Sequence, residues 1–257
     1  MDGSDAPTRS DPPSADDAAA DKPAPPLAPF TEYTAEDAAW LQSQRHAKML
    51  DARIRIIGVA HRVDGKPAVL ACYPLRVTGQ ATASEGTHAS RREIRGGSKR
   101  KWQDDAPAPW PNFLWLCEPT LTLRAGRLEH LGLVQQFQEE VGTNATFAAE
   151  LAAAHKAYGD ARWAALTDAD REYCESRHTS FPAVLRDTGV GGLRFASQVK
   201  CLHAHLAHTL AGGDNPVGRR VVEMLKEGRD AEVCTSATTT NTNTSAPSDA
   251  DAVADGV

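Results

Sequence analysis

Apolar residues gather in three short runs in the first half of the chain. Residues 54–60 and 68–73 have strand length, and Asp64-Gly65 between them is typical of a tight hairpin turn. Residues 113–117 form a third run, which ends before Pro119. The pattern therefore predicts a small antiparallel sheet of about three strands.

Helical periodicity is found on both sides of these runs. Residues 34–50 are predicted to form a helix, because Thr34 and Asp37 have the spacing of a capping box. Residues 127–141 have apolar positions at spacings of three, and Gly142 follows them. This segment is predicted to be one amphipathic helix.

The second half of the chain predicts four more helices, each marked by a start or a stop signal. They are an Ala-rich helix capped by Asn144, one at 167–177 capped by Thr167, one at 193–211 ended by Gly212-Gly213, and one that begins at Asn215-Pro216 and runs to about 227. The predicted class is α+β, with five or more helices covering the sheet.

Composition divides the chain into a domain and two tails. Residues 1–30 are rich in Ala, Pro, Asp and Ser, and residues 229–257 in Thr, Asn, Ser, Ala and Asp. The formal net charge is −6, and most of the acidic excess lies in these two segments. Such segments bury too little apolar surface to fold. We expect two disordered acidic tails around a single domain at 31–228.

A basic segment interrupts the domain at about 79–108. It has little apolar periodicity, and six lysines and arginines lie between residues 91 and 101. The segment is expected to be a solvated insertion loop, with a contact surface for an anionic partner as the alternative. Nucleic acid is disfavoured as a partner, although residues 91–101 leave it open.

Two classes of protein are excluded by simple counts. No run reaches the ~18 apolar residues of a membrane span, so a membrane protein is not expected. The chain contains five scattered cysteines, too few for a disulfide scaffold, so a reducing compartment is expected. The N-terminus shows no targeting signal, and the default location is the cytoplasm.

The predicted helix 193–211 contains the best candidates for chemistry. On a helical wheel of about 100° per residue, an apolar stripe runs along one face. The stripe consists of Phe195, Val199, Leu202, Leu206 and Leu210. Cys201, His205 and His208 follow one another at i, i+4 and i+7 on a different face, with His203 nearer the stripe. A thiol and imidazoles at this spacing suit zinc.

Two further residues could join this cluster, and Cys201 has two other interpretations. Cys117 or His155 could complete a set of four ligands. Cys201 could instead act as a nucleophile beside a histidine, or be a buried structural thiol. Glu129 lies on the polar side of its predicted helix, and we expect it to be solvated.

A glycine-rich loop precedes the same helix. Its glycines permit close backbone approach, and a helix N-terminus behind them would offer free N–H groups to an anion. The candidate anion-binding residues are Gly189, Gly191, Gly192, Arg186 and Arg194. The alternative is a flexible entry to the helix, since the loop lacks the Lys-Ser/Thr of a P-loop.

Several segments resemble an uncharacterised, largely bacterial family, domain of unknown function 501, over roughly residues 48–226. They are Gly58-Val59-Ala60-His61-Arg62, Phe113-Leu114-Trp115-Leu116-Cys117-Glu118-Pro119, Arg127-Leu128-Glu129-His130-Leu131-Gly132, Ala153-Ala154-His155-Lys156-Ala157-Tyr158, Gly191-Gly192, Val199-Lys200-Cys201-Leu202-His203, Ala207-His208 and Asn215-Pro216-Val217-Gly218. The resemblance implies membership of this family and implies no activity.

The resemblance also changes the weight of individual residues. Relatives often have a Cys-Pro-Cys-Gly turn in the first hairpin, where this chain has Val63-Asp64-Gly65. Residues 203 and 208 match the family better than residue 205 does. The mismatch at residue 205 weakens the row of Cys201, His205 and His208 as a unit and favours His203. If the thiols of the hairpin turn bind metal in relatives, this chain lacks that part of the site.

Two hypotheses follow. The first is a metal- or anion-binding domain centred on the helix 193–211, with a small enzyme as one form of it. Zinc would be the metal, and a phosphate-containing anion such as polyphosphate or a nucleotide would be the partner. The second is a non-enzymatic protein-interaction module that uses the basic insertion and the acidic tails.

Overall fold

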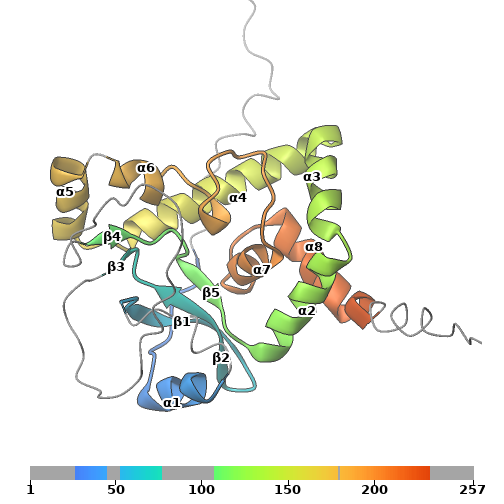
Figure 1. Cartoon of the computed structure of the whole chain (residues 1–257), viewed down its shortest axis with the longest axis horizontal. Helices are drawn as coiled ribbons and strands as arrows, with labels where there is room; N and C mark the ends of the chain where they lie inside the picture. The colour runs from blue at the N-terminus through green and yellow to red at the C-terminus, as the bar shows by residue number, and fades with distance from the viewer. Residues whose placement is uncertain (1–26, 45–52, 77–106, 179, 232–257) are drawn as a thin grey trace, which may run out of the picture.

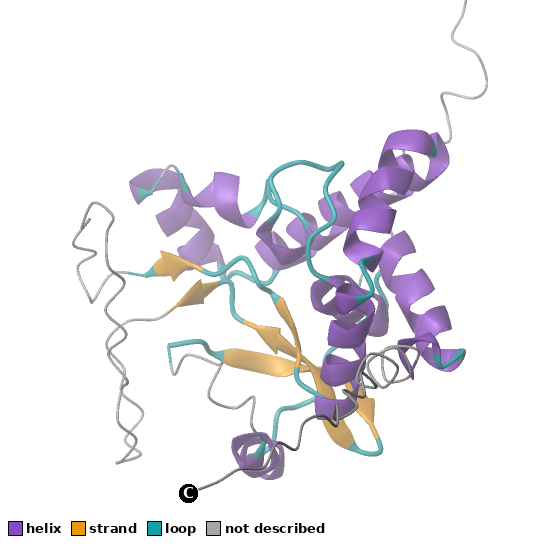
Figure 2. Cartoon of the chain, turned by 45° about the vertical axis from the view of Figure 1, so that its right-hand side comes forward, coloured by secondary structure: helices purple, strands orange, loops and turns teal. Residues whose placement is uncertain are grey.

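A computed structural model describes residues 27–44, 53–76, 107–178 and 180–231. A three-stranded antiparallel sheet and a separate two-stranded sheet lie against a larger set of helices, so the predicted α+β class is confirmed (Figures 1 and 2). The strands are β1 Ile56–Val63, β2 Lys66–Cys72, β3 Leu75–Arg76, β4 Ala108–Pro109 and β5 Leu114–Leu116. The α-helices are α1 Ala35–Ser43, α2 Pro119–His130, α3 Leu133–Thr143, α4 Ala145–Ala164, α5 Asp168–Arg177, α6 Phe181–Leu185, α7 Leu202–Leu210 and α8 Pro216–Lys226.

The main sheet has the order β1-β2-β5, so β2 is its central strand. Side chains of β2 alternate between two cores: Val69 and Ala71 pack with the helices, and Leu70 packs on the side of α1. The turn between β1 and β2 has positive φ at both Asp64 (49°) and Gly65 (75°), as a type I′ hairpin requires. The hairpin prediction is confirmed.

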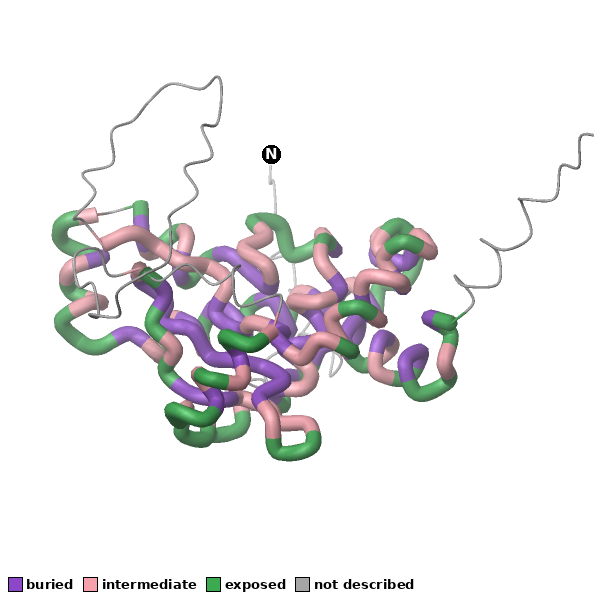
Figure 3. The backbone as a smooth tube through the Cα atoms, turned by 60° about the horizontal axis from the view of Figure 1, so that its bottom comes forward, coloured by how far each residue is buried: buried purple, intermediate pink, exposed green. Residues whose placement is uncertain are grey.

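Helix α7 occupies the centre of the helical layer and packs on β5, α2 and α8 (Figure 1). Its Leu202, Leu206 and Ala207 are fully buried. The buried residues lie mostly in the middle of the molecule (Figure 3). A smaller core beside β3 and β4 joins Tyr73 and Leu75 to α5 and α6.

Four of the predicted helix starts are confirmed by their caps. Thr34 and Asp37 form the reciprocal capping box of α1. Side-chain oxygens of Asn144, Thr167 and Asn215 accept backbone N–H groups at the starts of α4, α5 and α8. Residues 45–50 of the first predicted helix lie outside the described residues.

The helix predicted at 127–141 is two helices. Helix α2 begins at Pro119 and ends at His130, and α3 begins at Leu133. Gly132 between them has a φ of +80°, which glycine adopts without the strain of a side chain. Leu128 and Phe137 both reach the core, so the apolar spacing was compatible with one helix or two. The prediction of a single helix was wrong.

The prediction of a helix at 193–211 is also wrong for the first half of that segment. A short 3₁₀ turn, η3 Val190–Gly192, has positive φ at Gly191 and Gly192, and helix α7 starts only at Leu202. The backbone N–H of Val199 donates to the side chain of Gln138 instead of a helical carbonyl. Phe195, placed in the core by the wheel, is 64% exposed.

Short parts of both predicted tails pack on the domain. Leu27 and Phe30 contact the main core, and the backbone N–H of Ala28 donates to the carbonyl of Ala211. Asp230, in the turn η4 Arg229–Ala231, is buried and pairs with Arg124 at 2.7 Å. The rest of both tails, and residues 79–106 of the predicted insertion, lie outside the described part of the chain.

Candidate metal centre

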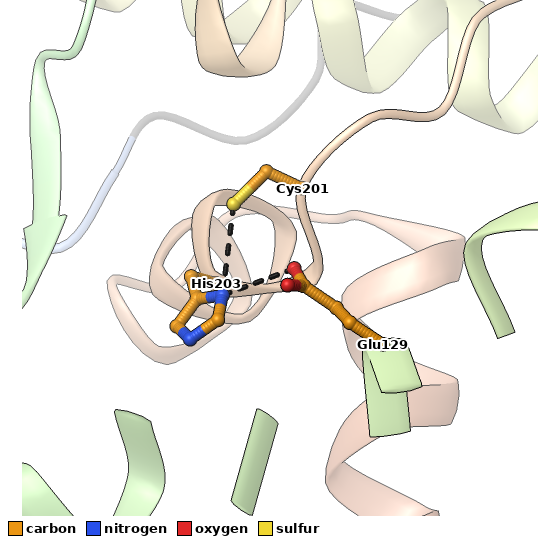
Figure 4. Close-up of side chains that lie close together, drawn as sticks. All are labelled: Glu129, Cys201 and His203. Atoms are coloured by element: carbon orange, nitrogen blue, oxygen red, sulfur yellow. Dashed lines mark hydrogen bonds and ion pairs between the residues drawn. The ribbon is translucent and has the colours of Figure 1, made fainter. Parts of the chain in front are cut away.

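Glu129, Cys201 and His203 meet where the C-terminal end of α2 lies beside the start of α7 (Figure 4). One ligand atom from each lies within 4.8 Å of the others. Among the His, Cys, Asp and Glu side chains of the described part of the chain, these three form a group that could hold a metal ion. Cys201 is the N-cap residue of α7, so its thiol points from the loop and not from the helix face.

The two ends of the helices are joined by the carboxylate of Glu129. Its Oε1 accepts the backbone N–H of Leu202 at 2.7 Å and lies 3.0 Å from Nδ1 of His203. The sulfur of Cys201 lies 3.7 Å from the same Nδ1 atom. The N–H of Leu202 belongs to the first turn of α7, which has no partner within the helix. Glu129 therefore fixes the position of α7 as well as contacting the imidazole.

The hydrogen bonds define which nitrogen of His203 carries a proton. Nε2 lies 2.9 Å from the backbone carbonyl of Thr122. A carbonyl only accepts, so Nε2 must donate. In the neutral ring, Nδ1 would then direct a lone pair at the carboxylate of Glu129 and the sulfur of Cys201. The carboxylate oxygen 3.0 Å away favours a positive species at Nδ1, either a second proton or a metal cation.

The pKa shifts of His203 and Glu129 agree with a positive charge at Nδ1 of His203. Hydrogen bonds with Cys201 and Glu129 raise the pKa of His203 to about 10. Burial acts in the opposite direction on Glu129, yet the hydrogen bond and charge of His203 lower its pKa. The group of Glu129, Cys201 and His203 therefore favours a cation.

The group is open to solvent on one side. The side chains of His203 and Glu129 are 27% and 29% exposed, and Cys201 is also half-buried. A metal held here would have three protein ligands and room for a water molecule. Catalytic zinc sites have this form, whereas structural zinc sites are closed by four protein ligands.

The structure brings together two of the predicted ligands and adds one that was missed. Cys201 and His203 are in the group, whereas Glu129 was expected to be solvated. Glu129 and His203 are 74 residues apart, and only the packing of α2 on α7 joins them. The feature of the sequence that could have identified Glu129 as a site residue is its position in a segment that resembles the family.

His205 and His208 lie apart from Cys201, as buried histidines of the core. Because α7 begins after Cys201, the predicted spacing of i, i+4 and i+7 does not apply. Both rings contact the amide of Asn215. Burial lowers the pKa of His205 to about 3 and that of His208 to about 4, so both are neutral at pH 7.

Cys117 and His155 do not join the group. The thiol of Cys117 is buried in the core beside α1, donates to the carbonyl of Pro67, and has its pKa raised to about 12 by burial. Nδ1 of His155 accepts the N–H of Val190, and Nε2 donates to the carbonyl of Gln198, each at 3.0 Å. Neither side chain has a ligand atom within 4.8 Å of all three residues of the site.

The glycine loop lacks the helix N-terminus on which the anion-binding prediction rested. No helix begins directly behind it, because α7 starts at Leu202. The N–H groups of Gly189 and Gly192 donate to carbonyls inside the loop, and that of Val190 donates to His155. The backbone of Gly189–Gly192 therefore offers no nest of free donors. Arg186 and Arg194 line a cavity that is described below.

The sequence matches the family described as "Protein of unknown function (DUF501)" over residues 59–223. This match covers more than half of the chain, and the protein belongs to this family. Glu129, Cys201 and His203 all lie inside the matched region. No curated protein and no solved structure matches the chain. Among the helices that the structure describes, none has the length and apolar character to cross a membrane.

Proposed function

We propose that this protein binds a single divalent transition metal, with zinc as the preferred ion, through Glu129, Cys201 and His203. The observation that supports the proposal is the environment of Nδ1 in His203. This atom faces a carboxylate and a sulfur, while the opposite ring nitrogen is committed to the carbonyl of Thr122. A metal cation satisfies all three donor atoms together.

The donor atoms and their spacing suit zinc. Sulfur, imidazole nitrogen and carboxylate oxygen are its usual ligands, at about 2.0–2.3 Å from the ion. Ligand atoms around a tetrahedral ion at those bond lengths are about 3.3–3.8 Å apart. The separations of 3.7 Å for sulfur to Nδ1 and 3.0 Å for Nδ1 to Oε1 are close to this range. Small side-chain movements would admit the ion.

The surrounding hydrogen bonds also resemble those of a metal site. Metal-binding histidines usually donate their second N–H to a carbonyl or carboxylate, as His203 does to Thr122. The carboxylate of Glu129 is oriented by the N–H of Leu202. Both ligands are thus held by backbone groups of a packed helix pair, which reduces the entropy lost on binding.

The open side gives the proposed ion a chemical role. An ion with three protein ligands can hold water in its fourth position and lower the pKa of that water to about 7. The reaction class that this supports is metal-assisted attack of water on a substrate. The interaction-module hypothesis rests on segments outside the described residues and stays a prediction.

A thiol nucleophile is the second candidate, because protonated His203 lies beside the sulfur of Cys201. In a catalytic triad, however, the base uses one ring nitrogen toward the nucleophile and the other toward the orienting carboxylate. Here Cys201 and Glu129 both approach Nδ1. The geometry is thus less suited to proton relay than to chelation.

The test is the metal content of untagged protein purified without chelators, measured by inductively coupled plasma mass spectrometry. Zinc affinity is measured in parallel against a chromophoric chelator. We expect near-stoichiometric metal in the wild type and at least a tenfold loss of affinity in Glu129→Gln, Cys201→Ser and His203→Gln. The matched controls Glu139→Gln and His130→Gln alter exposed residues near the site in sequence and should retain the metal.

Two results would overturn the proposal. One is folded wild-type protein that contains no metal and takes up no added zinc, cobalt or manganese. The other is equal affinity in the three ligand variants and the two controls. Circular dichroism of each variant distinguishes loss of the metal from loss of the fold.

A further inference from the structure

A cavity of about 380 Å³ opens between α4 and the loop that leads toward α7. Lys156 and His155 of α4 line one side, and Arg186, Gly189 and Arg194 line the other. Glu129, Cys201 and His203 are not part of its wall. The cavity is therefore a separate feature from the proposed metal centre, and the proposal below does not depend on that centre.

Positive charge exceeds negative charge around this cavity. Lys156 pairs with Asp160 at 2.6 Å, and Arg186 pairs with Asp187 at 3.2 Å. All four of these residues line the wall, together with Arg194. No ion pair reaches Arg194 from any residue that the structure describes. The guanidinium of Arg194 is therefore left for a ligand. Lys156 has one exposed partner, and Arg186 is shared between Asp187 and the ring of Trp163, whose centroid lies 5.5 Å from the guanidinium carbon.

The loop that carries Arg194 is fixed at both ends by one imidazole. His155 accepts the N–H of Val190 at Nδ1 and donates from Nε2 to the carbonyl of Gln198. The side chain of Gln138 adds a second clamp, since it donates to the carbonyl of Ser197 and accepts the N–H of Val199. The segment is thus anchored to α4 through His155 and to α3 through Gln138.

The segment that carries Arg186 is also held closely. A Cβ atom on Gly159 would lie 2.3 Å from the carbonyl oxygen of Arg186, so only glycine lets this backbone lie on α4. Below it, the buried guanidinium of Arg162 donates to the carbonyls of Leu185 and Thr188. The cations on the loop side are thus presented by a rigid backbone, as preorganised binding requires.

We propose that this cavity binds a small molecule that carries one or two phosphate groups. Its volume falls within the ~300–1,000 Å³ of small-molecule sites. Guanidinium groups pair with phosphate through two parallel hydrogen bonds, and three cations that line one cavity match the several oxygens of a phosphate better than the two of a carboxylate. Asp160 and Asp187 compete with the ligand for Lys156 and Arg186.

Because these aspartates compete with the ligand, removing a cation and removing an aspartate should have opposite effects on the affinity for the ligand. Arg194→Gln and Lys156→Gln should weaken binding roughly tenfold each, because each removes a charged hydrogen-bond donor. Asp187→Asn should tighten binding severalfold, because it releases Arg186 and removes a negative charge. Lys226→Gln in α8 is the matched control, since it removes an exposed positive charge that does not line the cavity.

Isothermal titration calorimetry of the full chain with inorganic phosphate, pyrophosphate and AMP tests the proposal. Tightest binding of pyrophosphate indicates an inorganic diphosphate ligand, and tightest binding of AMP indicates a nucleotide or related organic phosphate. Repeating the titrations in Glu129→Gln excludes binding through a metal, so failure here is distinct from failure of the metal proposal. No binding of any probe, or equal weakening by Arg194→Gln and Lys226→Gln, would overturn it.

Discussion

The amide group of Asn215 donates a hydrogen bond to Nδ1 of His208 across 3.2 Å, inside the core. The same amide nitrogen lies 3.0 Å from Nδ1 of His205, and its oxygen accepts the N–H of Gly218 at the start of α8. The amide nitrogen only donates, so the imidazole of His208 must be an acceptor at Nδ1. Nδ1 of His205 also lies 3.2 Å from the amide oxygen of Asn215, so its role is not fixed by this contact. Protonation of His208 at that atom would place two donors against each other.

This network predicts acid sensitivity. Burial lowers the pKa of His208 from 6.5 to about 4, so the unfolded chain binds a proton that the folded chain excludes. The free energy of unfolding therefore has its full value above pH 6.5 and decreases as the pH falls toward 4. By this linkage His208 alone should account for a loss of about 2–3 kcal/mol at pH 4.5.

Urea unfolding at pH 7.5, 6.0 and 4.5 measures the effect. In His208→Gln, whose side-chain oxygen can still accept from Asn215, the free energy of unfolding should depend less steeply on pH. His130→Gln changes an exposed histidine and should keep the wild-type dependence. Parallel pH curves for the wild type and His208→Gln would show that His208 is not excluded from protonation in the fold.

Arg162 stabilises the irregular segment between α6 and η3. Its side chain is fully buried and donates to the carbonyls of Pro111, Leu185 and Thr188. Arg162→Met would leave several buried carbonyls without donors, so we expect a loss of at least about 3 kcal/mol in unfolding free energy. Arg177→Met, at an exposed site, should change it by less than about 0.5 kcal/mol. A small effect of Arg162→Met would mean that water replaces the guanidinium.

Local signals predicted most of the fold. Asp64-Gly65, Thr34, Asn144 and Thr167 act within a few residues of themselves, and the elements they mark are present. The errors arose where one periodic pattern had two solutions. Apolar spacing continued across Gly132, although its positive φ ends the helix there.

The candidate site was predicted only in part, for a related reason. Cys201 and His203 are close in sequence, and the family motif drew attention to both. Their contact with Glu129 depends on the packing of α2 against α7, which no local pattern encodes. Conversely, His205 was predicted as a ligand because helical spacing was extended to residues before Leu202, where the helix begins.

Thiol reactivity should distinguish Cys201 from the other cysteines. Burial raises the pKa of Cys72 and Cys117 to about 12 and that of Cys174 to about 11, and all three are buried, whereas Cys201 is half-buried. Cys234 lies outside the described residues, so the test uses Cys234→Ser. One thiol of the folded, chelator-treated protein should react rapidly with an aromatic disulfide reagent, and four after denaturation.

The same reaction reports on the proposed metal. Zinc bound to the sulfur of Cys201 should slow labelling, and the chelator-treated protein should recover the fast rate. Cys201→Ser should abolish the fast phase. Fast labelling that persists in Cys201→Ser would show that a cysteine of the core is accessible, which contradicts the structure.

The close approach of Gly189 to His155 gives the last prediction. A Cβ atom at residue 189 would lie 2.3 Å from Nδ1 of His155, the atom that accepts the N–H of Val190. Gly189→Ala must therefore displace the imidazole that fixes both ends of the loop. We expect it to lower the unfolding free energy by about 1–3 kcal/mol and to weaken phosphate binding at the cavity.

Gly142→Ala is the matched control for this change. Gly142 lies in α3, where an added Cβ would meet no atom within 4 Å, so alanine should leave stability unchanged or raise it by up to about 1 kcal/mol. Urea unfolding and pyrophosphate titration of the two variants provide the comparison. If Gly189→Ala is as stable as Gly142→Ala and binds pyrophosphate equally well, His155 does not position the loop.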